Sequence, residues 1–432
     1  MGMTLAPEVA VMLGQLFEKI RFQSGDSRRM HPIHRAAPPA YCQQLRRTMI
    51  KPDPVPCALH AAAAFAQAHE MPWPRDPAAE PGRWGLHHDD PPPYNRLRAA
   101  VHPRGPQSGV VWQQGRELIA WGEPERADQT FSIAKTYLAL LAGVAHDQGL
   151  LPDEHAPVVE RLPGIGFEGA HNRSITWDHL LTQTSEWEGS CFGLPDSVDR
   201  WRTVTQDPRP AGGPKGGARP LQAPGSYWEY NDVRINQLAL ALLHLFGAPL
   251  PEVFLERVLR PLGGGEGFAW RGYDDAWVEL PGRGLVQSVP GGTHWGGGVS
   301  ISARDQARIG QMMLDGGHRA GRQLISRAWL ERMRVPCAVA PFYGRLLWLN
   351  PEGRAFPGAS AQAFFMLGAG GQTVWMDPVL DAVVVLRWLD PAHAPDVVQR
   401  LAGALALSAD SSRSQSAARA QQGEITRTTD SL

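Results

Sequence analysis

Residues 131–151 read FSIAKTYLALLAGVAHDQGLL, and the apolar run after the lysine predicts a helix that is buried in the core. A lysine in the first turn of such a helix is unusual here, because only four of the 42 basic residues are lysines. Ser132 and Lys135 lie three positions apart and therefore share one face of the helix. The polar stretch before them places Ser132 at the helix N-terminus, where free N–H groups and the helix dipole favour a developing anion.

This serine–lysine pair has a chemical explanation. Burial in apolar surroundings disfavours the charged form of a lysine, and a neutral amine can take the proton of a serine hydroxyl. An arginine cannot do so, because its guanidinium stays protonated. The pair therefore predicts an activated serine. The alternative is that Ser132 only caps the helix while Lys135 extends to the surface.

The composition of the 432 residues limits the expected partners and compartment. A net charge of −1 gives no electrostatic basis for binding nucleic acid or anionic membranes. Four scattered cysteines without CxxC spacing favour reduced thiols, and no metal or other cofactor is implied. Residues 1–22 read as an amphipathic helix rather than a secretory signal, and no run of 18 apolar residues occurs. We therefore expect a cytoplasmic protein without a membrane partner.

Strand patterns lie towards the two ends of the chain, with helical patterns between them. Residues 108–124 read as a hairpin, residues 364–389 as a second hairpin-like pair of strands, and residues 390–407 as a closing helix. These patterns predict an α+β fold, in which helices flank an antiparallel sheet built from both ends of the chain. The predicted parts are a helical, Pro-rich extension (1–95), a main domain (96–408) with a helical subdomain at about 145–290, and a disordered tail (409–432).

Two other segments have more than one interpretation. The Gly/Pro-rich loop 209–225 is too long for a simple connector and reads either as a lid or wall of a site or as a plain insertion. The cluster His87–Asp90 reads as a solvated loop rather than a metal site, because neighbouring positions point apart.

Segments across residues 100–407 resemble the superfamily of serine β-lactamases and penicillin-binding proteins, in particular its class C and carboxylesterase (family VIII esterase) branch. The first is the motif Ser132-x-x-Lys135. The second is Tyr230-x-Asp232, in which an acid replaces the usual asparagine. The further segments are SITWDHLLTQTSEWEG (174–189), with Gln183 and Glu186 in place of His and Gly, RPLGGGEG (260–267), HWGGGVSISARDQARIGQMMLDGG (294–317) and GAGGQTVWMDP (368–378).

The resemblance implies roles for these residues. Ser132 would be the acylated nucleophile, Lys135 its base or the tuner of its proton, and Tyr230 a second base that later protonates the leaving group. Asp232 would orient Lys135 and, as an anion, favours Tyr230 as the base with Lys135 charged. The expected oxyanion hole consists of the N–H groups of Ser132 and Ala369. The residues expected to support these groups or to line the substrate pocket are Gly368, Gly370, Gly371, Trp187, Trp295 and Trp348, with bulge formation as the alternative for the last two glycines and core packing as the alternative for each tryptophan.

The third motif departs most from the family pattern. Its expected cation is replaced by Met366, before Leu367 and Gly368, which argues against a dedicated β-lactamase or D-alanyl-D-alanine peptidase. We therefore predict a serine hydrolase of a small-molecule ester or amide that needs no cofactor or metal. The alternatives are a β-lactamase or peptidase, and a non-catalytic relative that binds a ligand. The sequence does not determine the oligomeric state.

Overall fold

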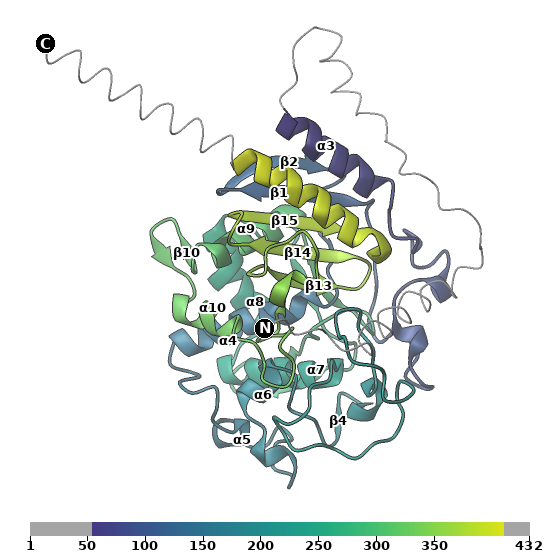
Figure 1. Ribbon diagram of the computed structural model, residues 1–432. Coiled ribbons are helices and arrows are strands. Elements are labelled where there is room, and N and C mark those ends of the chain that lie inside the picture. The colour runs from purple at the N-terminus through teal and green to yellow at the C-terminus, as the bar shows by residue number, and fades with distance from the viewer. Residues whose placement is uncertain (1–53, 410–432) are drawn as a thin grey trace, which may run out of the picture.

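The computed structural model describes residues 54–409. The predicted helix at residues 1–22 and the tail at 410–432 lie outside this range. Six strands form one antiparallel sheet in the order β12-β13-β14-β15-β1-β2, which confirms the predicted α+β fold with a sheet built from both ends of the chain (Figure 1). The strands are β1 (Ser108–Gln113), β2 (Arg116–Trp121), β3 (Asp128–Gln129), β4 (Ser190–Cys191), β5 (Leu194–Pro195), β6 (Ala269–Arg271), β7 (Trp277–Leu280), β8 (Gly284–Gln287), β9 (Gly298–Ile301), β10 (His318–Arg319), β11 (Arg322–Gln323), β12 (Trp348–Leu349), β13 (Phe364–Gly368), β14 (Gln372–Asp377) and β15 (Ala382–Arg387).

Helices cover both faces of this sheet. The helix over residues 394–409 lies beside α3 on one face, where the Arg400 guanidinium sits 4.2 Å from the centre of the Phe65 ring (Figure 1). On the other face, α9 packs against β1, β14 and β15, and α4 packs against β13 and β14. The named helices are α3 (Pro54–Gln67), α4 (Ile133–Asp147), α5 (Val158–Arg161), α6 (Trp177–Leu181), α7 (Asp232–Phe246), α8 (Leu250–Phe254), α9 (Ala303–Leu314) and α10 (Arg327–Met333).

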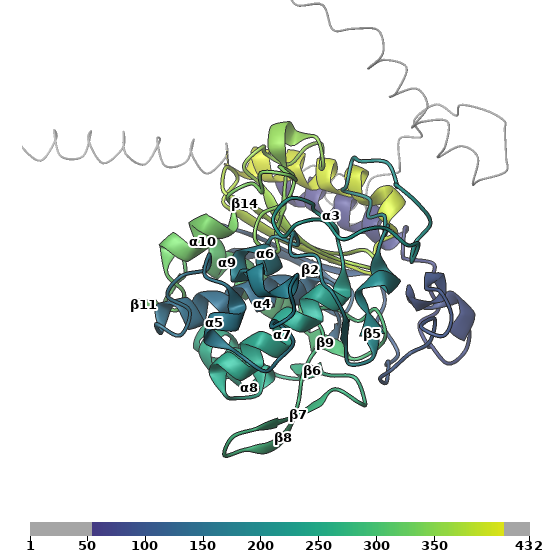
Figure 2. The same ribbon diagram turned by 90° about the horizontal axis from the view of Figure 1, so that it is seen from below.

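The apolar run after the lysine forms α4, and every residue from Ile133 to Ala145 is buried. The predicted central helix is therefore confirmed. Helix α7 packs beside α4 on the side away from the sheet. The region between α4 and α9 also contains strands that were not predicted, including the β7–β8 hairpin that projects from the body in Figure 2.

The strands near the C-terminus differ from the predicted pair. FFMLGAGGQTVWMDP is itself a hairpin, β13–β14, whose turn uses Gly370 and Gly371 at φ 72° and 69°. The next segment forms β15, so the region is a three-stranded meander. Gly371 has a second constraint, because a Cβ there would lie 1.6 Å from the carbonyl oxygen of Leu389.

A second, three-stranded sheet lies beside the start of α4. Its order is β3-β9-β6, and Gln129 of β3 pairs with Ser300 of β9. The Thr130 N–H donates to the carbonyl of Val299 in β9, and Gln129 Nε2 donates to the carbonyl of Gly297 in the glycine-rich segment before that strand. These contacts bring the segment that begins at Gly291 next to the first turn of α4.

Within residues 54–409, no single helix combines the length and apolar composition needed to cross a membrane. The helix pair Asp232–Phe246 and Leu250–Leu262 would meet both criteria only together, and it is bent by 76° at its break. The expectation of reduced thiols is wrong for Cys57, which is disulfide-bonded, while Cys191 and Cys337 are free.

Candidate active site

Ser132 lies at the start of α4, directly after a strained residue. Phe131 has φ 51°, and its ring is buried against Trp84 and Trp388, which fixes the approach to the helix. The Lys135 Nζ donates hydrogen bonds to Ser132 Oγ (2.9 Å) and to the carbonyl of Gly291 (3.2 Å). Its side chain is 1% exposed, so the alternative in which Lys135 extends to the surface is wrong.

Asp232 forms an ion pair with Lys135 from the first turn of α7. The Nη1 of Arg202 binds the same carboxylate at 2.8 Å. Burial alone would raise the pKa of Asp232, but the charges of Arg202 and Lys135 outweigh it and hold that pKa well below its ordinary value. The acid in the second motif is therefore ionised and lies between two cations.

Tyr230 precedes α7 and is held in place by the cap of that helix. Asn231 accepts hydrogen bonds from the N–H groups of Val233 and Arg234, and its own N–H donates to Gln183 Oε1 at 2.8 Å. The Tyr230 ring stacks on Trp348 with 5.5 Å between centroids. Lys135 Nζ lies 4.8 Å from the centre of the Tyr230 ring, so the serine, the lysine and the tyrosine form one cluster.

A cavity of about 660 Å³ opens onto this cluster. Of the residues predicted to serve the site, Ser132, Tyr230, Trp348 and Gly368–Gly371, including Ala369, line it. Gly368 allows β13 to approach the segment before Ser132, since a Cβ there would lie 2.1 Å from the carbonyl oxygen of Thr130. Gly370 and Gly371 therefore both form the turn and line the cavity.

Two residues that were predicted to line the pocket, Trp187 and Trp295, lie away from this cavity. Trp187 packs against Phe167 in the core, and Trp295 is fully buried against Tyr273. Met366 is 1% exposed, and its neighbour Leu367, on the opposite face of β13, lines the cavity instead. The interpretation of Trp187 and Trp295 as core residues is the one that fits their positions.

Two segments that sequence reasoning left open form walls of the cavity. Met71, Trp73, Leu86 and Asp89 come from the part of the chain before the main sheet. The second wall consists of Trp201–Gln206, Ala211, Gly213 and Lys215. The loop 209–225 is therefore a wall of the site rather than a plain insertion.

An ionic network continues from Asp232 along the cavity. His294 Nε2 lies 2.8 Å from Asp90 Oδ2, and its Nδ1 lies 3.4 Å from Asp232 Oδ2. Lys215 pairs with Asp90 and with Asp199. We call this set the pocket-side network; it consists of Lys135, Asp232, Arg202, Asp199, Lys215, Asp90 and His294.

Part of this network has the donors of a metal site. The ligand atoms of Asp90, Asp199 and His294 all lie within 4.8 Å of one another, and all three residues are buried. The ammonium of Lys215 already pairs with both carboxylates, so it supplies the positive charge that a cation would bring. The cluster His87–Asp90 is not a simple solvated loop, because Asp90 and His87 are buried.

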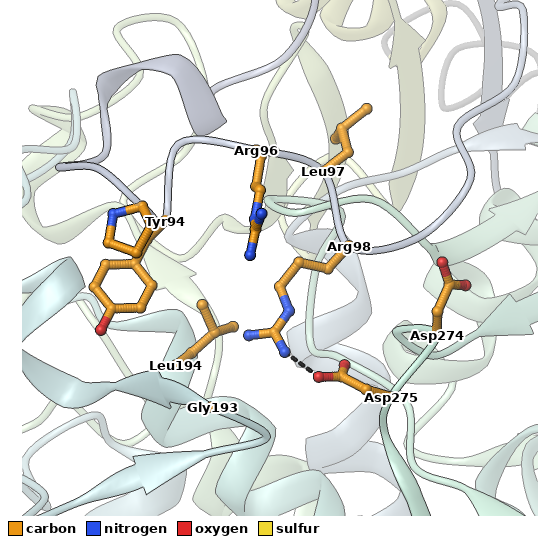
Figure 3. A pocket seen from close by; sticks show the side chains of 9 residues that line it. Tyr94, Arg96, Leu97, Arg98, Gly193, Leu194, Asp274 and Asp275 are labelled. Atoms are coloured by element: carbon orange, nitrogen blue, oxygen red, sulfur yellow. Dashed lines mark hydrogen bonds and ion pairs between the residues drawn. The ribbon is translucent and has the colours of Figure 1, made fainter.

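A second hollow of about 510 Å³ lies where residues 93–98 meet the β4–β5 turn and residues 274–275 (Figure 3). The Arg98 guanidinium is paired with Asp275, and Arg96 points into the same space. The residues that line this hollow include no serine, cysteine or histidine. The predicted Ser132 and Tyr230 line the first cavity and not this hollow.

Sequence reasoning missed several members of the pocket-side network. The rarity of lysine could have marked Lys215, since it is one of only four lysines in the sequence. Asp90 stood in a noticed cluster, but its partner His294 lies 204 residues away. Nothing in the sequence marks Arg202 or Asp199.

Comparison with known proteins agrees with this geometry. The model of the beta-lactamase family matches residues 109–406. The 6-aminohexanoate-dimer hydrolase of Paenarthrobacter ureafaciens is 36% identical over 110 residues, or 22% of this chain and 26% of that protein, so the match spans about a quarter of the curated relative. A Bacillus anthracis structure assigned as a 6-aminohexanoate-dimer hydrolase has TM-score 0.51 and 17% identity, covering 70% of this chain and 80% of that chain. A family VIII carboxylesterase has TM-score 0.49 and 18% identity, covering 68% and 92%. The two structural matches concern the fold alone.

Proposed function

Because the family match spans most of the chain, this protein belongs to the beta-lactamase family, and we propose that it hydrolyses an ester or amide through an acyl-enzyme on Ser132. The observation that carries the proposal is the 2.9 Å contact between Lys135 Nζ and Ser132 Oγ at a helix N-terminus that faces a cavity. A residue that served only to cap the helix would not need a buried lysine as its partner.

The charges around Lys135 favour Tyr230 as the base. Lys135 donates to Ser132 Oγ and pairs with the ionised Asp232, so it acts as an ammonium and leaves the serine proton free to transfer elsewhere. Tyr230, as a phenolate, takes that proton while Oγ attacks the substrate carbonyl carbon. The N–H groups of Ser132 and Ala369 receive the oxyanion.

The remaining steps return the enzyme to its starting state. The tetrahedral intermediate collapses, the bond to the alcohol or amine breaks, and Tyr230 gives the departing group its proton. Water then attacks the acyl ester, loses a proton to Tyr230, and Ser132 leaves with that proton as the acid product is released. The cycle uses only groups that line or touch the cavity, together with water.

The third motif, in which Met366 replaces the cation of the family pattern, favours esters and linear amides over β-lactams. Met366 puts no cation on β13, where the resemblance would place one for a substrate carboxylate. The name of the curated relative specifies hydrolysis of the 6-aminohexanoate dimer, which supports including short linear amides among the candidate substrates. A β-lactamase or peptidase activity is the alternative, and screening β-lactams and peptides beside esters and linear amides would detect it.

The test is the intact mass of the protein after incubation with a fluorophosphonate. We expect one adduct on the wild type and none on Ser132→Ala, followed by turnover of short esters or linear amides. The absence of an adduct on folded wild-type protein would refute the hydrolase mechanism and favour a ligand-binding relative. Turnover confined to β-lactams would show that the substrates are β-lactams rather than esters or linear amides.

A further inference from the structure

The site has a cation that the family resemblance did not predict. Arg202 lines the cavity, and the centre of its guanidinium lies 5.2 Å from the centroid of the Tyr230 ring. Lys135 Nζ lies 4.8 Å from the same centroid. Tyr230 therefore lies against two cations, one from α4 and one from the segment that follows Asp199.

Arg202 is firmly positioned by its neighbours. Its Nη1 donates to Asp199 Oδ2 (2.9 Å) and Asp232 Oδ2 (2.8 Å), and its side chain is 9% exposed. Its Nε and Nη2 have no hydrogen-bond partner among residues 54–409, which leaves donors free on a residue that lines the cavity. Burial works against the charged form, but the charges of Asp199, Asp232 and Tyr230 prevail and raise the pKa of Arg202.

The backbone before Arg202 is fixed as well. Trp201 adopts φ 59°, and its N–H donates to Glu229 Oε1 at 3.0 Å. Its indole lies so close to Gly212 that a Cβ there would approach within 2.0 Å. The strained backbone of Trp201 is held by the buried Glu229 carboxylate and by close packing, and it therefore fixes the position of Arg202, the next residue.

We infer that Arg202 is a positioning residue that stabilises the deprotonated form of Tyr230, a task that Lys135 does not perform alone. This inference rests on the proposed function. Asp232 lies between Lys135 and Arg202, so its single negative charge offsets only one of the two cations beside Tyr230. Asp199, the other partner of Arg202, is shared with Lys215. Among the members of the pocket-side network, Lys135 and Arg202 are therefore the two cations that lie against the Tyr230 ring itself.

The other groups that face Tyr230 do not supply this charge. Tyr343 and Trp348 pack against its ring and are neutral, and Trp228 lies 6.3 Å away between centroids. His294 contacts Asp232 rather than the ring.

The experiment measures the rate of fluorophosphonate labelling of Ser132 as a function of pH. Loss of the cation in Arg202→Gln should raise the pH of half-maximal labelling by about one to two units, because an opposite charge at this distance shifts an ionisation by that amount. Labelling near neutral pH should then fall about 10- to 100-fold and recover at high pH. Arg202→Lys, which keeps the charge, should restore most of the wild-type profile.

Arg209→Gln is the matched control. Arg209 belongs to the same segment, pairs with Asp207 and lies 4.9 Å from the centroid of the Trp228 ring, but it does not contact Tyr230. We expect its profile to match the wild type. If Arg202→Gln does not fold, Asp199→Asn/Arg202→Gln removes one charge of each sign and should show the same direction of shift.

The outcomes separate the two proposals. An unlabelled wild type would refute the proposed function itself. A labelled wild type with an unshifted profile in the folded Arg202 variants would overturn the inference alone. In that case Arg202 would be a structural residue or an anchor for an anionic substrate, since the neutral probe needs no anchor. A uniform loss at all pH values would likewise assign a structural role.

Discussion

Two ionic networks flank the first turn of α7, and they differ in what surrounds them. The pocket-side network contacts Ser132 through Lys135, and its members Arg202, Lys215 and His294 line the cavity. On the other side lies a core-side network, none of whose members lines that cavity. It consists of Asp196, Arg200, Glu186, Arg219, Glu229 and Arg234.

The core-side network is built around Arg234, whose side chain is fully buried. Arg234 binds Asp196 at 2.6 Å and Glu229 at 2.7 Å. Arg219 reaches in from the loop 209–225 and binds both oxygens of Glu186. These bonds tie the loop to the body of the protein.

Both networks contain three acidic and three basic side chains, and the pocket-side network adds His294. Equal charge balance therefore does not decide their roles. Access to the cavity separates the two networks, because a charge can act on a substrate or on a proton-transfer group only from the wall of a cavity. An ion cluster away from the cavity acts on the segments that it joins, and removing one partner of a buried pair is costly because it leaves an uncompensated charge.

The largest expected effect on the hydrolysis rate comes from removing the hydroxyl of Tyr230, which lies beside the pocket-side network. Tyr230→Phe should lower the hydrolysis rate by about 10²- to 10⁴-fold, because the proposed proton-transfer group is lost while the ring packing remains. Steady-state kinetics on a substrate found in the screen measure this. Tyr343→Phe is the control, since its ring packs against Tyr230 while its hydroxyl accepts from Gln183; the rate per labelled enzyme should stay close to wild type.

Next in size is a loss of stability in the core-side network. Arg234→Met leaves Asp196 and Glu229 with fewer cations in the interior, which should lower the free energy of unfolding by about 3–5 kcal/mol. Urea denaturation followed by fluorescence measures it. The exposed pair Arg260–Glu256 provides the control: Arg260→Met should cost less than about 1 kcal/mol. Equal losses in the two variants would contradict the comparison.

The loop 209–225 allows the sharpest test, since it contributes one cation to each network. Arg219→Met should reduce stability by about 2–3 kcal/mol and leave the rate per labelled enzyme nearly unchanged. Lys215→Met should reduce stability less, because its side chain is 18% exposed, and should lower the rate several-fold by leaving Asp90 and Asp199 without their shared cation. The reverse pattern would show that access to the cavity does not separate the two networks.

The smallest effect concerns pH and His87, which lies near the pocket-side network. Burial, together with the positive charges of His88 and His294, lowers the pKa of His87 from 6.5 to about 4. Between these values the unfolded chain binds a proton that the folded protein does not, so stability is full above pH 6.5 and falls as the pH drops towards 4. The melting temperature of His87→Gln should therefore fall less over this range than that of the wild type, whereas His102→Gln, at an exposed position, should follow the wild type.

The motif substitutions show how far sequence reasoning extends. Glu186 replaces a glycine of the family pattern, and the sequence offered no reason for the change. In the structure Glu186 adopts φ 51°, a strained conformation for a residue with a side chain, and its carboxylate binds Arg219 through both oxygens. The partner lies 33 residues away on a loop without a regular pattern, so the compensation becomes visible only after folding.

The sequence by itself determined the central helix, the sheet built from both ends of the chain, and the pairing of Ser132 with Lys135. Each of these depends on short-range periodicity or on a three-residue spacing, which a helix or strand converts directly into geometry. The tertiary structure alone decided that Arg202, Lys215 and Asp90 gather around Asp232 and His294. These residues come from segments with no common period, and long-range packing brings Asp90 to Lys215 across 125 positions of the chain. Local rules therefore specify the Ser132–Lys135 pair, while the charges that surround it depend on how distant segments meet.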